Sequence, residues 1–125
     1  MTVPLVHDTD LCDRNLPHAV RQELFGGQGA VCVWALTATP APPFTAVLAC
    51  ELEPAGSVGA HVQEQYPEIV IGISGSGIVK VNDVPVAFSA GRVVELAQGH
   101  TLSISNGSSS ESLRYLIIKA QATRP

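Results

Sequence analysis

The chain has 125 residues and a mass of 13.1 kDa, which is room for one ordinary domain. Apolar residues make up 46% of it and charged residues only 14%, a composition that can fill a core and that excludes charge-driven disorder. The 7 Lys and Arg residues are scattered against 11 Asp and Glu, for a net charge of −4. Without a basic stripe to neutralise phosphates, nucleic acid is not an expected partner.

No segment has the features of a membrane span or a secretory signal. Apolar runs are a few residues long, far below the roughly 20 needed to cross a bilayer, so no membrane partner is expected. The N-terminus, MTVPLVHDTD, lacks a basic region followed by an apolar one. Cys12, Cys32 and Cys50 show no CxxC spacing. We expect a cytoplasmic protein with free thiols, and a Cys32–Cys50 bridge stays an alternative because sequence supplies no geometry for it.

Residues 1–29 form a lead-in rich in Pro and Gly. Leu16, Ala19, Val20 and Leu24 follow a helix-like spacing, and Gly26 is suited to ending such a turn. The pattern allows either a short helix or an irregular lead-in.

From residue 30 onward, short β-rich runs alternate with turn signals. The runs are 30–39, 45–53, 68–74, 78–81, 84–88, 93–96, 100–106 and 113–119. Gly75-Ser76-Gly77 is interpreted as a turn, and Asn82-Asp83 as a two-residue hairpin because both residue types tolerate positive φ. This spacing predicts an all-β sandwich or barrel over residues 30–120, followed by a tail of residues 121–125.

The residues with the clearest chemical potential lie between Gly56 and Gly77. If residues 60–64 are extended, His61 and Gln63 point to the same side, because side chains alternate along a strand. Glu68 opens the next run, and its carboxylate can face the same interior, with His61 as its expected partner. An imidazole, an amide and a carboxylate that converge could hold a metal or line a small-molecule pocket.

At these residues the chain resembles the cupin superfamily. His61-x-Gln63, four residues, Glu68, six residues and Gly75 follow the first cupin motif, with Gln63 in place of the second histidine. In the second motif, the glycine and asparagine positions are filled by Gly91, Gly99 and Asn106. The motif's proline and metal-binding histidine positions are occupied by Ala97 and Leu102, with His100 two residues upstream.

The resemblance implies a double-stranded β-helix, or jelly-roll barrel, often paired as a dimer. It also implies a divalent metal such as Fe, Mn, Ni or Zn, held here by His61, Gln63, Glu68 and, after a bulge at Gly99, His100. The departures weaken that implication, because an amide oxygen is a poorer donor than imidazole and leucine is no ligand. The alternative, a cavity without metal, stays open.

Two functional hypotheses follow. In the first, the cavity binds a small molecule, with a loosely held metal and oxygenase-, isomerase- or cyclase-type chemistry in which Glu68 serves as ligand or base and His61 assists. In the second, the chain is a metal-free, non-catalytic module that binds, senses or scaffolds. A homodimer formed through residues 30–50 is expected in either case, because open sheet edges need covering.

Overall fold

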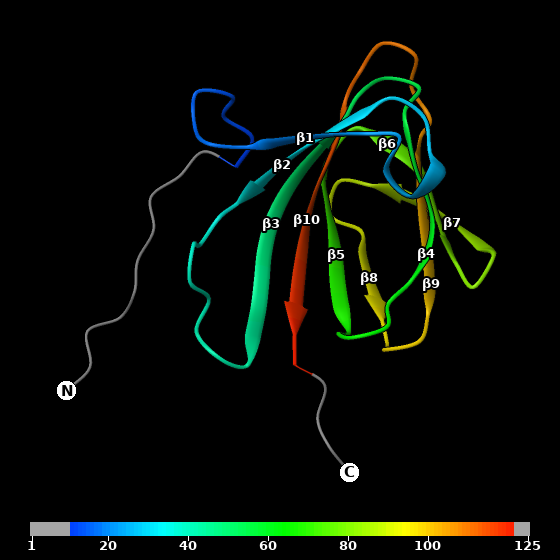
Figure 1. Cartoon of the computed structure of the whole chain (residues 1–125). Coiled ribbons are helices and arrows are strands. Elements are labelled where there is room, and N and C mark those ends of the chain that lie inside the picture. Colours follow the sequence, from blue (N-terminus) through cyan, green and yellow to red (C-terminus); the bar gives the residue numbers. More distant parts are fainter. Residues whose placement is uncertain (1–10, 122–125) are drawn as a thin grey trace.

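The computed structural model describes residues 11–121, which form two antiparallel sheets (Figure 1). The larger sheet has six strands, in the order β1 (Ala19–Gln22), β2 (Ala30–Ala35), β3 (Phe44–Leu52), β10 (Leu113–Ala120), β5 (Glu68–Ser74) and β8 (Val93–Leu96). The smaller has four, in the order β4 (Ser57–Val62), β9 (Thr101–Asn106), β6 (Ser76–Val81) and β7 (Val84–Ser89). The prediction of an all-β jelly-roll barrel is therefore confirmed.

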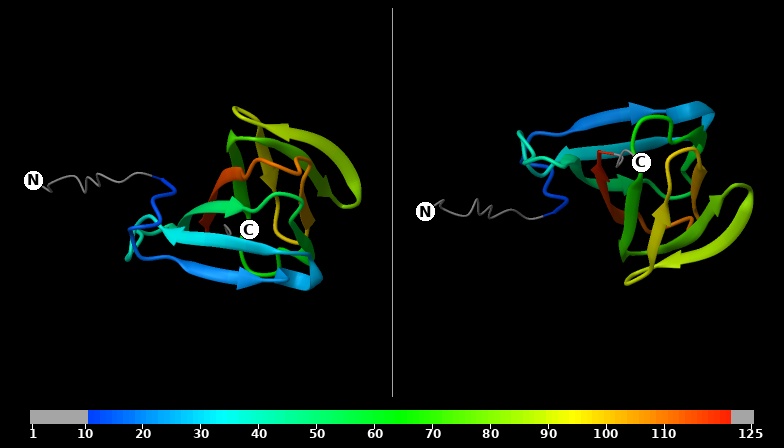
Figure 2. Two further views of the ribbon diagram at one scale, coloured as in Figure 1. Left: turned by 90° about the horizontal axis from the view of Figure 1, so that it is seen from above. Right: turned by 90° about the horizontal axis from the view of Figure 1, so that it is seen from below.

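Viewed from above and below, the two sheets face each other, with the β6–β7 hairpin on the side away from β1 and β2 (Figure 2). The inward faces of both sheets supply the main core, because successive side chains of a strand alternate between inside and outside. Val70 of β5 and Val79 of β6 are completely buried there, and Phe88 packs edge-on to Tyr115.

One of the two predicted turns forms as expected, and the other is shorter than expected. Asn82 and Asp83 both have positive φ and join β6 to β7 as predicted. The Gly75-Ser76-Gly77 turn is shorter than predicted, because only Gly75 turns the chain, with φ 86°, and β6 begins at Ser76. Gly77 is inside the strand, where a Cβ would lie 2.1 Å from the carbonyl oxygen of Ser105.

The described part of the lead-in joins the larger sheet. Ala19–Gln22 is a strand paired with β2, and the helix-like spacing produces only a 3-10 turn, η1 (Leu24–Gly26). Residues 1–10 of the lead-in and 122–125 of the tail lie outside the described residues. Because β1 covers the edge of β2, the two strands within residues 30–50 are internal to the sheet. The edge strands are β1 and β8 in the larger sheet and β4 and β7 in the smaller one, so a homodimer formed by edge pairing would use one of these instead of residues 30–50.

The segment before β1 packs on the outer face of the larger sheet. There Trp34, Cys32 and Ala49 form a second buried cluster, and the Trp34 indole donates a hydrogen bond to the carbonyl oxygen of Asp13 at 2.8 Å. The carboxylate of Glu51 accepts hydrogen bonds from the guanidinium groups of Arg14 and Arg114. These bonds tie the lead-in to β3 and β10.

All three cysteines are free thiols. Cys50 pairs with Val33 across β2 and β3, whereas Cys32 pairs with Glu51. The thiols of Cys32 and Cys50 therefore point to opposite faces of the sheet, which is why no bridge joins them.

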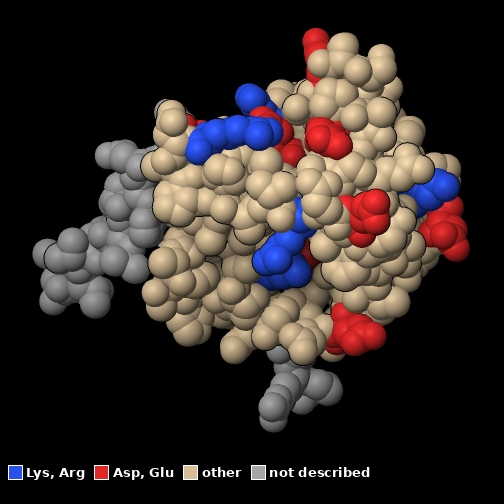
Figure 3. Space-filling model, turned by 45° about the horizontal axis from the view of Figure 1, so that its top comes forward, with Lys and Arg blue, Asp and Glu red and all other residues tan. Residues whose placement is uncertain are grey.

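No helix within residues 11–121 is long and apolar enough to cross a membrane. On the face drawn in Figure 3, the Lys and Arg side chains form separate small patches, with Asp and Glu side chains between them, and no continuous basic stripe.

Candidate functional site

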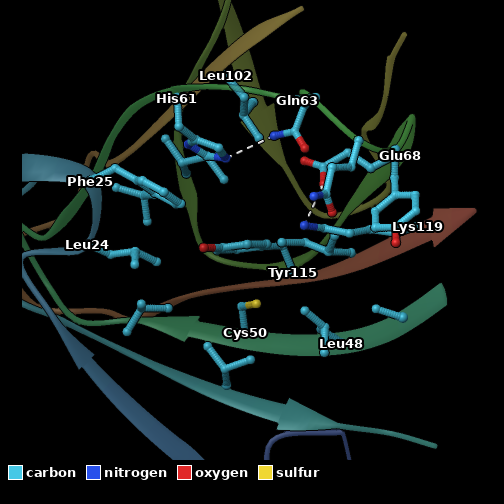
Figure 4. A pocket seen from close by; sticks show the side chains of 18 of the residues that line it. Leu24, Phe25, Leu48, Cys50, His61, Gln63, Glu68, Leu102, Tyr115 and Lys119 are labelled. Atoms are coloured by element: carbon cyan, nitrogen blue, oxygen red, sulfur yellow. Dashed lines mark hydrogen bonds and ion pairs between the residues drawn. The ribbon is translucent and has the colours of Figure 1, made fainter. Parts of the chain in front are cut away.

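The interior of the barrel holds a cavity of about 560 Å³, a size that suits a small molecule. Most of its wall is aliphatic or aromatic, and its polar groups come from His61, Gln63, Glu68, Thr45 and Lys119 together with the rim residues Glu64, Gln65 and Tyr66. Figure 4 shows His61, Gln63, Glu68 and Lys119 along one side, above Tyr115 and Cys50. The structure therefore brings three of the four predicted site residues to one cavity.

The geometry around His61 sets its tautomer. Its Nδ1 lies 3.2 Å from the carbonyl oxygen of Gly59, and a carbonyl only accepts, so Nδ1 carries the hydrogen. The lone pair on Nε2 then accepts a hydrogen bond from the side-chain amide of Gln63 at 2.9 Å. Burial lowers the pKa of His61, so the imidazole is neutral at pH 7.

Glu68 begins β5 directly beside Lys119 of β10. Its carboxylate is almost fully buried, and Oε2 lies 3.7 Å from the Lys119 ammonium, which is an ion pair longer than a hydrogen bond. Oε1 has no hydrogen-bond partner within residues 11–121. Burial raises the pKa of Glu68, and Lys119 offsets part of that rise. The partner of Glu68 is thus Lys119 and not His61, because register across the sheet decides the pairing.

His100 does not reach the cavity. Its Nδ1 accepts a hydrogen bond from the backbone N–H of Ala97 at 3.1 Å, which closes the turn before β9. The same loop holds Gln63 by two backbone bonds, to the carbonyl oxygen of His100 and from the N–H of Gly99. His100 therefore supports the backbone next to the site without lining the cavity.

Sequence reasoning missed Lys119 and Thr45. The alternation of Tyr115, Ile117 and Lys119 along β10 was the available signal, since all three line the cavity while Arg114 points to the opposite face. Tyr115 lies opposite Cys50 across β3 and β10. Burial raises the pKa of Cys50 to about 12, so this thiol is protonated and unreactive at neutral pH.

The lead-in also supplies part of the cavity wall, which the sequence did not indicate. The ring of Phe25 stacks on the imidazole of His61, with centroids 4.0 Å apart and planes 14° from parallel. Phe25 has a left-handed φ of 53° and is 55% exposed, an uncommon placement for a large apolar residue. The turn is held against β4 by close approach, since a Cβ on Gly59 would lie 1.9 Å from the Phe25 carbonyl oxygen.

The donor set does not fit a tightly held transition metal. Gln63 occupies the Nε2 lone pair of His61 with an N–H donor, and Glu68 is paired with Lys119. Leu102, where the cupin motif has a histidine, lines the cavity with an aliphatic side chain. No group of three or more His, Cys, Asp or Glu side chains in the described part of the chain has a metal-binding arrangement.

Comparisons with known proteins identify the fold. No protein-family model and no curated protein matches the chain. Among solved structures, a predicted oxalate decarboxylase from Thermotoga maritima superposes with a TM-score of 0.81 at 24% identity, covering 91% of this chain and 100% of the other. A Cupin 2 conserved barrel domain protein from Salinispora arenicola gives 0.69 at 22% identity, covering 94% and 92%.

A third structure with this fold is less similar in sequence. The cupin domain of Cnp3 from Schizosaccharomyces pombe gives a TM-score of 0.68 at 17% identity, covering 83% of this chain and 69% of the other. At these identities the likenesses establish the fold and leave function to the site itself. The two facing antiparallel sheets, the motif spacing and these superpositions together show that the chain has the cupin fold.

Proposed function

We propose that the chain binds a small, mainly apolar molecule in the barrel cavity without a tightly held metal. The observation that carries this proposal is the pair of buried oxygens, Glu68 Oε1 and Thr45 Oγ1, that line the cavity without a partner in the described structure. Buried polar atoms are nearly always hydrogen-bonded, so two unpartnered oxygens on residues that line a mainly apolar cavity are typical of a site that a ligand completes.

The experiment is a titration with the neutral fluorophore N-phenyl-1-naphthylamine. Ala46 and Val47 are neighbours on β3, and of the two only Ala46 lines the cavity. Ala46→Phe should weaken saturable binding because the ring occupies part of the cavity, whereas Val47→Phe, the matched control, should leave it unchanged. Binding that survives Ala46→Phe and is lost in Val47→Phe would place the site elsewhere.

Independence from metal is tested by thermal unfolding with added Fe(II), Mn(II), Ni(II) or Zn(II). A ligand that binds only the folded state must raise the melting temperature. We expect no rise for the wild-type protein, because Gln63 occupies the Nε2 lone pair of His61 and Leu102 provides no ligand, which leaves the Glu68 carboxylate without the further ligands that a metal needs. A rise that disappears in both His61→Ala and Glu68→Ala would overturn this part of the proposal.

A second candidate function is acid–base catalysis on the bound molecule. A buried carboxyl whose pKa burial raises, in a cavity that also holds a neutral imidazole, is an arrangement suited to proton transfer. In this function Glu68 takes or gives the proton and His61 orients the ligand. Any turnover found should therefore be lost in Glu68→Gln while ligand binding persists.

A further inference from the structure

The chemical class of the ligand follows from how few bonds the Glu68 carboxylate makes. Its side chain is 1% exposed, and among residues 11–121 its Oε2 has only the 3.7 Å ion pair with Lys119 and its Oε1 has no partner. Buried carboxylates are normally stabilised by several hydrogen bonds, because each oxygen can accept two. The missing partner is therefore a hydrogen-bond donor.

A second buried polar group lies at the same end of the larger sheet, on β3. Lys119 pairs with Ala46 of β3 on one side and with Glu68 of β5 on the other. Thr45, next to Ala46, therefore belongs to the same end of the barrel as Glu68, about two strand spacings away at ~4.8 Å each. Its hydroxyl is also buried without a partner in the described part of the chain, and a hydroxyl can either donate or accept.

Charge balance excludes most ionic ligands. The Glu68 carboxylate and the Lys119 ammonium neutralise each other, and His61 is neutral. Glu64, the remaining charged residue of the lining, is exposed at the rim, where water screens it. A charged group entering this cavity would therefore be buried without a counter-ion, which is costly, whereas a neutral donor group would not.

The rest of the cavity sets the body of the ligand. Its remaining wall is mostly aliphatic, and the Phe25 ring, stacked on His61, adds a flat aromatic surface at the entrance. Flat aromatic rings gain from offset or edge contacts with such a surface in addition to the area they bury.

We propose that the cavity selects neutral, hydroxyl-bearing molecules with an apolar, ring-containing body, and that the hydroxyl donates a hydrogen bond to Oε1 of Glu68. Thr45 supplies a second polar contact, and the Lys119 ammonium favours the ionised form of the carboxylate, which accepts the hydrogen bond. This inference rests on the proposed function, since it requires that the cavity take a ligand.

The experiment uses four molecules of nearly equal shape: 2-naphthalenemethanol, 2-methylnaphthalene, 2-naphthylmethylamine and 2-naphthoate. Each competes with N-phenyl-1-naphthylamine at pH 7.5, where the amine is a cation and the acid an anion. We expect the alcohol to bind about tenfold more tightly than the hydrocarbon, which corresponds to one hydrogen bond to a charged acceptor. Both ions should bind more weakly than the alcohol.

Two variants test whether the preference for the alcohol over the hydrocarbon depends on the Glu68 carboxylate. Glu68→Met removes the carboxylate and should make the alcohol and the hydrocarbon bind equally. Glu95→Met makes the same chemical change on β8 outside the cavity and should leave the tenfold preference intact.

The outcomes separate the two proposals. Failure of N-phenyl-1-naphthylamine to bind at all would overturn the proposed function and this inference with it. Normal dye binding with the alcohol no tighter than the hydrocarbon, or with either ion binding tightest, would overturn the inference alone.

Discussion

Gly59 offers the sharpest test of how the lead-in is fixed to the cavity. A Cβ at this position would meet the Phe25 carbonyl oxygen at 1.9 Å, about 1.5 Å short of the 3.4 Å at which ordinary contact begins. The obstacle is backbone and not a flexible side chain, so Gly59→Ala must push η1 away from β4. Strain of this kind costs about 1–3 kcal/mol in a packed site, and an overlap this large lies at the upper end of that range.

A loss of about 3 kcal/mol lowers the melting temperature by roughly 12 °C in a domain of this size. The assay is equilibrium unfolding in urea, with the slope checked to remain constant so that the midpoint reports stability alone. Displacement of η1 also breaks the Phe25–His61 stack, so binding of N-phenyl-1-naphthylamine should weaken in the same variant.

Gly107 is the matched control. A Cβ there would meet its nearest atoms at 3.5 Å, which is ordinary contact, and neither glycine requires positive φ. Gly107→Ala should change stability by less than about 1 kcal/mol. Equal losses in the two variants would refute the argument from close approach, because both would then reflect a general intolerance of substitution at glycine.

Three further predictions follow from the buried charges and from the single tryptophan. Burial alone would raise the pKa of Glu51, but hydrogen bonds from Arg14 and Arg114 outweigh it and lower that pKa below 4.5. The ionised Glu51 carboxylate therefore stabilises the folded state above pH 4.5, and this stabilisation is lost as the pH falls through the folded-state pKa. Glu51→Gln should therefore cost about 2 kcal/mol at pH 7 and little at pH 3, and a pH-independent difference in urea unfolding would contradict this. The pKa of Glu68 is shifted in the opposite direction: because it is raised, the contribution of Glu68 to stability is greatest below pH 4.5 and is lost as the pH rises through the folded-state pKa. Glu68→Gln should therefore stabilise the protein by about 1 kcal/mol at pH 7 and have no effect at pH 3. Destabilisation by Glu68→Gln at pH 7 would instead show that the hydrogen-bonding needs of the carboxylate are met in the folded protein. Trp34 is buried under the lead-in, so its fluorescence should be blue-shifted and shielded from quenching by acrylamide. Arg14→Ala should increase this quenching, because it removes the hydrogen bond from Arg14 to Glu51. Unchanged quenching would mean that this bond does not hold the lead-in in place.

Local pattern was enough to predict most of the barrel. The alternation of apolar and polar residues between turn signals placed every strand from residue 30 onward except β4, and Asn82-Asp83 predicted its hairpin because few residue types accept positive φ in succession. An extended conformation over residues 60–64 was assumed to place His61 and Gln63 on one side; β4 ends at Val62, and the two side chains do meet, in a hydrogen bond. Such features depend on neighbours in the sequence and are encoded by residue types alone.

The pairings that define the site depend on contacts between distant parts of the chain. Lys119 meets Glu68 only because β10 lies between β3 and β5, and Phe25 covers His61 only because η1 fits against the bare backbone of Gly59. Ala19–Gln22 has helix-like spacing yet forms a strand, because the open edge of β2 offers its backbone hydrogen-bond partners. Residue types and spacing indicated a β-sandwich or barrel, which the cupin resemblance narrowed to a jelly roll, with an imidazole, an amide and a carboxylate facing inward. The partner of each of these groups depends on strand register and on close approach of the backbone, which join residues that no local pattern relates.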